Sequence, residues 1–387
     1  MNQREAVIVA YGRSPVGKAP KGAYRCTHPV DLGAQTLKGV LARVPELKAE
    51  DIDDVVVGCA YPEERQGWQF SRIIVQRAGL PDSVCAQTLT RFCSSGLQAI
   101  ATGGNAILAG QADVVVAGGV ESMTMVRKMS YPQEYWEGYL AEHYPEAYMA
   151  PGLTAELVAE RYHVTREDME AMAVESHRRA AAAQEAGLFD EEIIPIEALQ
   201  EDGSRVTITR DEGVRPGTTA EKLATLKPCF KEGGVVTAAT SSQMSDGASF
   251  VVLMSREKAA ELGLTPVARL VSFAVGGCPA EVMGLGPIYA VPKALKRAGM
   301  TLDQMEVIEL NEAFAAQALP CIRELGMDPA KVNPNGGAMA LGHPLGATGA
   351  VLTCKVLSQL KRQKGRYGMV TMCVGGGMGA AGIYELL

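Results

Sequence analysis

Apolar runs without a clean alternation of polar residues occur in both halves of the chain, and each is followed by a helix-like pattern. Near the start, AVIVAYG at 6–12 precedes DLGAQTLKGVLARV at 31–44. In the second half, ARLVSFAVGG at 268–277 precedes VPKALKRAGM at 291–300. Such Val-, Ile- and Ala-rich runs are typical of strands buried on both faces. The pattern therefore predicts an α/β protein.

The order of these elements repeats. The first copy continues through an uncharged helical stretch after Cys93 into the strand-like DVVVAGGVES at 113–122. The second continues through AVLTCKVLSQLKR at 350–362 into YGMVTMCVGGGMG at 367–379. The final strands also correspond, GASFVVLMS at 247–255 and GAAGIYELL at 379–387. We predict two related α/β halves that pack in layers.

A long segment of different texture separates the last two strands of the first copy. It holds most of the aromatic and charged residues, and Thr165 with Asp168 has the pattern of a helix start, with the helix stopping at Gly187. Short strand-like runs, IIPIEAL and SRVTITR, follow. An insert of this length predicts a subdomain over a site on the scaffold. The predicted division is 1–121 plus 247–265 for the first half, 122–246 for the insert, and 266–387 for the second half.

Composition narrows the function classes. The 387 residues are 47% hydrophobic, 21% charged and 5% aromatic, which is typical of a globular α/β chain. The net charge of -7 argues against nucleic-acid binding. Nine cysteines without a Cys-x-x-Cys pair fit neither a disulfide framework nor a zinc site, so we expect reduced thiols and no metal. The uncharged stretch 92–112 is rich in small polar residues, which favours a buried helix over a membrane span. Because the start lacks a signal-peptide pattern and the thiols are expected to be reduced, we predict a cytoplasmic protein.

Cys93 is the first candidate for chemistry. It follows a short strand-like run and stands directly before Ser94, Ser95 and Gly96, where a helical pattern begins. The free N–H groups and positive dipole end of a helix start favour a thiolate, so this position predicts a pKa lowered from the usual value of about 8.5. On this stretch alone, a small buried cysteine that only packs is the commoner alternative.

Related loops of two pseudo-twofold copies meet at one place, and four polar features fall on such loops. They are Cys93, Asn311 in NEAF, His343 in GHPLGATG, and Cys373 ahead of Gly375 and two further glycines. Each alone has an ordinary alternative: the histidine stabilises a loop, the asparagine caps a helix, and the second cysteine packs in the core. A glycine turn also exposes N–H groups that can stabilise an oxyanion.

Nine segments that run from one end of the chain to the other resemble the thiolase family, in that family's order. They are RFCSSGLQA, GGVESM, GVRPGTT, LATLKPCF, SSQMSDGA, VMGLGP, NEAFAAQ, NGGAMALGHPLGATGA and MCVGGGMGAA. Within the family the chain looks like the degradative 3-ketoacyl-CoA thiolases, or acetyl-CoA acyltransferases, of fatty-acid β-oxidation. The resemblance implies a duplicated, layered αβαβα fold with an inserted loop subdomain. It also implies thiolytic cleavage of a 3-ketoacyl-CoA by CoA through an acyl-enzyme.

The resemblance assigns catalytic roles to five positions. Cys93 is the implied nucleophile that carries the acyl group as a thioester. His343 is implied to take the thiol proton and to help hold the oxyanion, with Asn311 acting through a bound water. Cys373 is the implied second acid/base, and the backbone N–H groups of Cys93 and Gly375 form the implied oxyanion hole.

The resemblance also implies substrate contacts. Ser242 matches a serine at the pantetheine arm, and Lys227 matches a basic residue near the adenine nucleotide; taken alone they are a loop-capping hydroxyl and a solvated charge. The full set implied for CoA and the acyl chain is Ser242, Lys227, Ala238, Met283, Phe314 and Phe92. No metal or redox cofactor is implied, because CoA is a substrate.

Three departures from the family pattern leave the acyl-chain length open. Phe92 stands where relatives tend to have Leu or Gln. Ala150 and Pro151 stand where many relatives have His-Met or Met-Met, and Gly277, Cys278 and Pro279 differ from the commoner Val-Asp-Pro version. All three departures border the implied acyl or pantetheine path.

Other functions and partners stay open from the sequence. The nearest alternative is a biosynthetic acetoacetyl-CoA thiolase, and more distant ones are a decarboxylating condensing enzyme and an inactive CoA- or lipid-binding relative. The resemblance implies a homodimer or homotetramer and, in some relatives, a multifunctional hydratase–dehydrogenase partner. The C-terminal IYELL is not a peroxisomal address of the Ser-Lys-Leu type.

Overall fold

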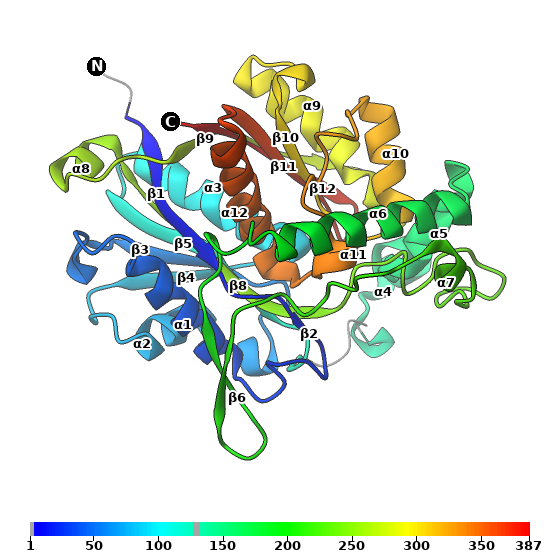
Figure 1. Ribbon diagram of the computed structural model, residues 1–387, viewed down its shortest axis with the longest axis horizontal. Helices are drawn as coiled ribbons and strands as arrows, with labels where there is room; N and C mark the ends of the chain where they lie inside the picture. Colours follow the sequence, from blue (N-terminus) through cyan, green and yellow to red (C-terminus); the bar gives the residue numbers. More distant parts are fainter. Residues whose placement is uncertain (1–3, 127–131) are drawn as a thin grey trace.

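A mixed ten-stranded sheet forms the framework of the computed structural model, which describes residues 4–126 and 132–387 (Figure 1). The strand order is β10-β11-β12-β9-β1-β8-β5-β3-β4, with β2 paired to β8. The strands are β1 (Ala6–Arg13), β2 (Gly17–Lys18), β3 (Asp54–Gly58), β4 (Cys85–Leu89), β5 (Val114–Ser122), β8 (Ser245–Ser255), β9 (Ala268–Gly277), β10 (Val307–Leu310), β11 (Tyr367–Val374) and β12 (Met378–Leu386).

The two halves of this sheet repeat one pairing scheme. In the first half β1 pairs antiparallel with β8, β8 antiparallel with β5, and β5 parallel with β3. In the second half β9, β12, β11 and β10 pair in the same order and with the same directions. The halves join where Ile8 of β1 pairs with Ala268 of β9. The duplicated α/β architecture predicted from the repeat is confirmed.

Helices lie between and outside the two half-sheets (Figure 1). The layer helices are α1 (Pro29–Leu41), α2 (Phe70–Arg77), α3 (Ser95–Leu108), α9 (Gly286–Ala298), α10 (Ala315–Leu325) and α12 (Leu345–Gln363). The helices α3 and α12 pack on each other in the centre, α1 and α2 cover the first half-sheet, and α9 and α10 cover the second. Because apolar strands meet helices on both faces, the strands carry continuous apolar runs.

Glycines let the two central helices touch. A Cβ on Gly96 of α3 would lie 2.8 Å from the carbonyl oxygen of Gly346 in α12, and one on Gly349 would lie 2.4 Å from the nitrogen of Leu97. Only glycine permits so close an approach of two backbones. The starts of both helices, which follow Cys93 and His343, are therefore brought together.

The insert folds as separate small elements beside the sheet. It contains α4 (Gly138–His143), α5 (Pro151–Arg161), α6 (Arg166–Glu185), α7 (Ala220–Ala224) and the hairpin of β6 (Ile196–Leu199) with β7 (Arg205–Ile208). As predicted, the Thr165 side chain accepts a hydrogen bond from the Asp168 N–H at 3.1 Å, and the helix ends before Gly187, whose φ is +68°. The domain boundaries at 121/122, 246/247 and 265/266 stay a prediction.

Buried charges attach the insert to the scaffold. Arg13, at the end of β1, donates to Glu192 at 2.8 Å and to both oxygens of Asp211 at 2.7 and 2.9 Å. All three side chains are almost fully buried, so each charge depends on its partners for solvation. Within residues 4–126 and 132–387, no helix is both long and apolar enough to cross a membrane.

Candidate active site

Cys93 lies in one turn of 3-10 helix, η3 (Phe92–Ser94), between the end of β4 and the start of α3. The Ser95 hydroxyl holds this turn: it accepts from the Arg91 N–H at 2.9 Å and donates to the Phe92 carbonyl at 2.6 Å. Phe92 has a φ of +42°, a conformation that is costly for a residue with a side chain. The tight turn leaves Cys93 partly exposed at the helix start, as the sequence predicts.

The protonation of Cys93 is the reverse of the sequence prediction. Burial raises the pKa of the thiol to about 11, and hydrogen bonds from the Gly375 N–H and from its own N–H only partly oppose this. The helix start is therefore outweighed by desolvation of the charged form. At neutral pH the side chain is a thiol, so a nucleophilic role requires a nearby base.

His343 lies in the short link between α11 (Ala338–Leu341) and α12. Its N–H donates to the Gln243 carbonyl at 3.1 Å, its Nδ1 lies 2.6 Å from the Thr348 hydroxyl, and its Nε2 lies 3.2 Å from Nδ2 of Asn311. Burial lowers the pKa of the imidazole to about 3, so the ring is neutral at neutral pH. With the Asn311 amide donating to Nε2, the ring proton lies on Nδ1, and Nε2 carries the lone pair of a base.

Asn311 follows β10, beside the strand that carries Cys373. Its N–H donates to the Thr371 carbonyl of β11 at 3.0 Å, which fixes its height relative to Cys373 two residues further on. The side chain is fully buried, and among the described residues its Oδ1 has no hydrogen-bond partner. A buried oxygen of this kind normally binds a water or a ligand donor. It is therefore able to hold a water at the site.

Cys373 lies near the end of β11 and is fully buried. It packs with Met283 of η6 (Ala280–Leu285), with Ala313, and with the edge of Phe314. Burial raises the pKa of this thiol well above its usual range, and a negative charge on Cys93 raises it further. Cys373 is therefore a neutral thiol whose pKa rises when Cys93 carries a negative charge.

The glycine turn after β11 completes the constellation. Gly376 and Gly377 have φ values of +80° and +87°, and a Cβ on Gly377 would lie 2.3 Å from the Cys278 carbonyl oxygen. The turn directs the Gly375 N–H at the Cys93 sulfur. Since the start of α12 also packs on η3, all five predicted catalytic positions come to one place.

The predicted substrate contacts divide into two groups. Met283 and Phe314 lie beside Cys373, and the Ser242 N–H donates to the Ala313 carbonyl at 2.8 Å, which brings Ser242 to the same wall. Phe92 is 39% exposed, with its ring 6.1 Å from that of Tyr61. Lys227 and Ala238 are exposed on the insert.

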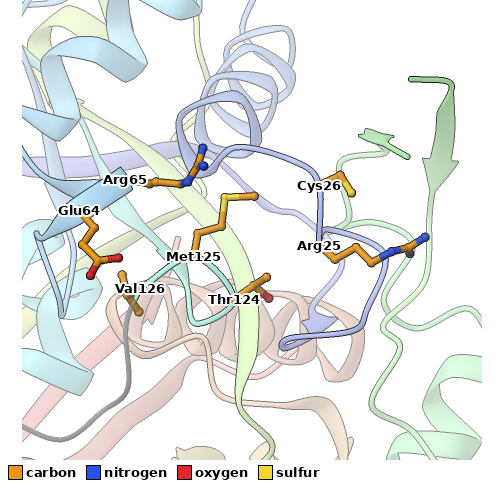
Figure 2. Close-up of a pocket in the computed structure, with 7 residues that line it drawn as sticks. All are labelled: Arg25, Cys26, Glu64, Arg65, Thr124, Met125 and Val126. Atoms are coloured by element: carbon orange, nitrogen blue, oxygen red, sulfur yellow. The ribbon is translucent and has the colours of Figure 1, made fainter. Parts of the chain in front are cut away.

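An open pocket of about 490 Å³ has a different lining. Figure 2 shows its residues, Arg25, Cys26, Glu64, Arg65, Thr124, Met125 and Val126, on loops of the first half. None of the predicted site residues is among them. In the described part of the chain, no group of three or more His, Cys, Asp or Glu side chains could hold a metal ion.

Two residues that orient the site were missed by the sequence reasoning. Thr348 fixes the imidazole through Nδ1, and Glu121 accepts a hydrogen bond from the Gly346 N–H at 2.7 Å. Both belong to the motifs GHPLGATGA and GGVESM, so the motifs were a signal that these residues mattered. The Thr348–His343 contact is local, within one motif, whereas the Glu121–Gly346 contact joins the two halves and no local pattern predicts it.

Comparison with known proteins places these features in one family. The models "Thiolase, N-terminal domain" and "Thiolase, C-terminal domain" match residues 6–257 and 264–386. A 3-ketoacyl-CoA thiolase of Bacillus subtilis (strain 168) is 51% identical, with 99% of this chain and 100% of the relative covered. The peroxisomal 3-ketoacyl-CoA thiolase B of Mus musculus is 45% identical, with 98% and 90% covered.

A solved structure agrees with these matches. The acetyl-CoA acetyltransferase of Bacillus anthracis is 39% identical and superposes with a TM-score of 0.91, covering 100% of this chain and 99% of that one. The two family models together match nearly the whole chain, and the solved structure has the same fold over its full length, so the predicted family is confirmed. The chain belongs to the thiolase family.

Proposed function

We propose that the chain cleaves 3-ketoacyl-CoA with CoA, giving acetyl-CoA and an acyl-CoA shortened by two carbons. The observation that carries the proposal is the meeting of two cysteines from different halves, Cys93 and Cys373, at a neutral His343. A covalent acyl carrier and a separate proton donor are both needed for Claisen cleavage. The names of the B. subtilis and mouse relatives support the same reaction.

In the first half-reaction Cys93 loses its proton to Nε2 of His343, and its sulfur attacks the 3-keto carbon. The C2–C3 bond then breaks, and its electron pair remains on C2 of the departing acetyl-CoA. Cys373 donates its proton to C2, so acetyl-CoA leaves neutral and the acyl group stays on Cys93 as a thioester. The fully buried position of Cys373 supports this role, because a protonated thiol is the form that burial favours.

In the second half-reaction the Cys373 thiolate takes the proton of the incoming CoA thiol. The CoA sulfur attacks the thioester, the bond to Cys93 breaks, and the Cys93 thiolate recovers its proton from His343. Two donor sets support the oxyanions of the two steps: His343 with a water held by Asn311, and the backbone N–H groups of Cys93 and Gly375. Donors of this kind, fixed before the reaction, lower the barrier where charge develops.

The substrate surfaces follow from the same geometry. We propose that Met283, Phe314 and Phe92 line the acyl path, that Ser242 and Ala238 contact the pantetheine arm, and that Lys227 faces the nucleotide. The catalytic steps need no metal and no redox cofactor, because proton transfers and thioester exchange account for every bond made and broken.

A biosynthetic acetoacetyl-CoA thiolase is the second candidate, and the name of the B. anthracis structure favours it. We expect kcat/KM for a 3-ketoacyl-CoA of about eight to sixteen carbons to exceed that for acetoacetyl-CoA by roughly tenfold or more, since each buried methylene is worth about 0.8 kcal/mol. Steady-state thiolysis rates across a chain-length series measure this. A clear preference for acetoacetyl-CoA would show that the degradative assignment is wrong.

A dimer is proposed from the free edge of the sheet. In the described residues β4 ends the strand order and pairs only with β3, and a pocket of about 480 Å³ lies beside it, lined by residues from β3, β4, α3 and β5. Exposed strand edges are normally paired or covered. We expect light scattering to give at least twice the 41.0 kDa chain mass; a monomer at micromolar concentration would refute the proposal.

Location and partners complete the proposal. We infer a cytoplasmic enzyme that can associate with a hydratase–dehydrogenase of β-oxidation, because that partner supplies 3-ketoacyl-CoA. Cell fractionation tests the first inference. Co-purification at native expression levels tests the second, and failure of the two proteins to associate would remove the partner without affecting the reaction.

A further inference from the structure

Glu121, at the end of β5, is fully buried and has no part in the mechanism above. Its Oε2 accepts hydrogen bonds from the N–H groups of Ala60 and Gly346, both at 2.7 Å. Its Oε1 accepts from the Gln66 amide at 2.7 Å and from the Tyr61 N–H at 3.4 Å. Burial raises the pKa of this carboxyl group, and the four N–H donors partly oppose that rise because they favour the charged form.

These donors belong to both halves of the protein. Ala60, Tyr61 and Gln66 follow β3 of the first half, whereas Gly346 lies in the first turn of α12, three residues after His343. The negative charge therefore also faces the positive end of a 19-residue helix. Glu121 is the point at which a single side chain ties the first half to the histidine-bearing helix of the second.

The surrounding backbone leaves little room for adjustment. A Cβ on Gly346 would lie 2.6 Å from the Glu121 Oε2 and 2.7 Å from the Ala60 nitrogen, and one on Gly119 would lie 2.1 Å from the Gly346 carbonyl oxygen. The Gln66 side chain is itself fixed, because its oxygen accepts from the Ser122 N–H at 2.5 Å. A small change in the length of the carboxylate arm therefore has to move the start of α12.

The same carboxylate acts on the Cys93 turn. The Tyr61 ring packs on Phe92, next to the nucleophile. The titratable groups around the Cys93 turn are Tyr61 after β3, Cys373 on β11, Glu121 on β5 and His343 before α12, with the Gly375 N–H as the opposing dipole. Of these, a negative charge on Glu121 raises the pKa of Cys93 in the same direction as burial, which is the larger cause.

We propose that Glu121 is a positioning residue with two separable effects: its length sets the His343 loop against the Cys93 turn, and its charge adds to the burial that keeps the Cys93 thiol protonated in the resting protein. The inference rests on the proposed thiolase reaction for its first effect only. The second effect concerns the resting thiol and can be measured without turnover.

Two substitutions separate length from charge. Glu121→Asp keeps the charge but is one methylene shorter, so it cannot reach Gly346 and Gln66 together. Glu121→Gln keeps the length and removes the charge; its amide NH2 also replaces one acceptor oxygen, so it loses the hydrogen bonds from either Ala60 and Gly346 or Gln66 and Tyr61. Iodoacetamide labelling of Cys93, followed by mass spectrometry of its peptide over a series of pH values, reports the thiolate. Steady-state thiolysis reports kcat and KM.

The expected results differ between the variants. In the parent, labelling should accelerate about tenfold per pH unit from neutral to alkaline pH. Glu121→Gln should move this curve to lower pH by roughly 0.5 to 1 unit, because a nearby negative charge is lost. Glu121→Asp should leave the curve in place but lower kcat about 10- to 100-fold with little change in KM, because the catalytic loops are misplaced.

A matched control and the contrary outcomes complete the test. Glu63→Gln removes an exposed carboxylate from the same loop and should leave both measurements unchanged. An unshifted labelling curve in Glu121→Gln overturns the charge effect, and full kcat in Glu121→Asp overturns the positioning effect. If Glu121→Gln does not fold, Glu121→Asp with Glu63→Gln still decides the positioning effect. A parent that labels normally but cleaves no 3-ketoacyl-CoA would instead reject the proposed function.

Discussion

Replacing Cys93 with alanine is expected to lower kcat/KM for thiolysis by about 10⁴- to 10⁶-fold, because the acyl-enzyme can no longer form. The loss corresponds to roughly 5 to 8 kcal/mol of transition-state stabilisation. Binding of CoA should change little, since the thiol makes only a small part of the substrate surface. Steady-state rates with a medium-chain 3-ketoacyl-CoA measure the first effect, and equilibrium binding of CoA measures the second.

Trapping the acyl-enzyme tests the effect of Cys93→Ala independently of the steady-state rates. Mixing the parent with substrate and quenching in acid should leave an acyl mass on the Cys93 peptide, and Cys93→Ala should show none. Cys26→Ala is the matched control, because this partly exposed thiol lines the separate pocket of Figure 2 and should leave the rate unchanged. An acyl group on another residue, or a parent that traps none, would contradict the nucleophile assignment.

The fold was largely predictable because its information is local and repeated. The run ARLVSFAVGG was predicted as a strand and is β9 (Ala268–Gly277), and the helix predicted after Thr165 is α6 (Arg166–Glu185). The helix predicted from Val291 begins earlier, at Gly286, because Pro287 in its first turn is compatible with a helix start. Because the same order of strands and helices occurs twice, the repeat also predicted that the equivalent loops of the two halves lie close together.

The electrostatics of the site were not predictable from the same patterns. The sequence correctly placed Cys93 at a helix start, but the pKa of its thiol depends on how much water the folded chain excludes. Burial outweighs the helix start and raises the pKa to about 11. The role of Glu121 was not predicted for a related reason, because its 2.7 Å contact with the Gly346 N–H exists only after the halves pack. The 2.6 Å contact of Thr348 with His343 is local, but it depends on the ring orientation that the folded loop imposes.

This protonation state changes how the site must work. Burial favours the thiol form of both cysteines at rest, and in the proposed mechanism the neutral His343 is the base. The nucleophile is therefore generated only when the proton moves to the imidazole as the substrate carbonyl accepts the sulfur. Such an arrangement limits unproductive reactions of the free thiol, and it makes the second cysteine, whose acidity follows the charge of the first, the natural proton donor for the carbanion.

Cys373→Ser is expected to separate carbon–carbon cleavage from acyl transfer. The hydroxyl is a much weaker acid than the thiol, so protonation of the acetyl-CoA carbanion should slow and thiolysis should fall about 10²- to 10⁴-fold. Exchange of labelled CoA into an acyl-CoA passes through the Cys93 thioester and still uses residue 373 as the base for the incoming CoA thiol, but it forms no carbanion. At a pH where the free CoA thiol itself ionises, exchange should therefore be reduced less than thiolysis. The two rates, measured on one preparation, give the ratio that defines the role.

The neighbouring buried thiol provides the control for this substitution. Cys321 is fully buried and acts electrostatically on Cys373, so Cys321→Ser makes the same atomic change next to the site and should keep both rates near those of the parent. Serine is close in size to cysteine, so neither variant leaves a large cavity. Unchanged thiolysis in Cys373→Ser would show that Cys373 is not the second acid/base. Equal loss of both rates would mean that Cys373 acts mainly as the base for the CoA thiol and not as the proton donor to carbon.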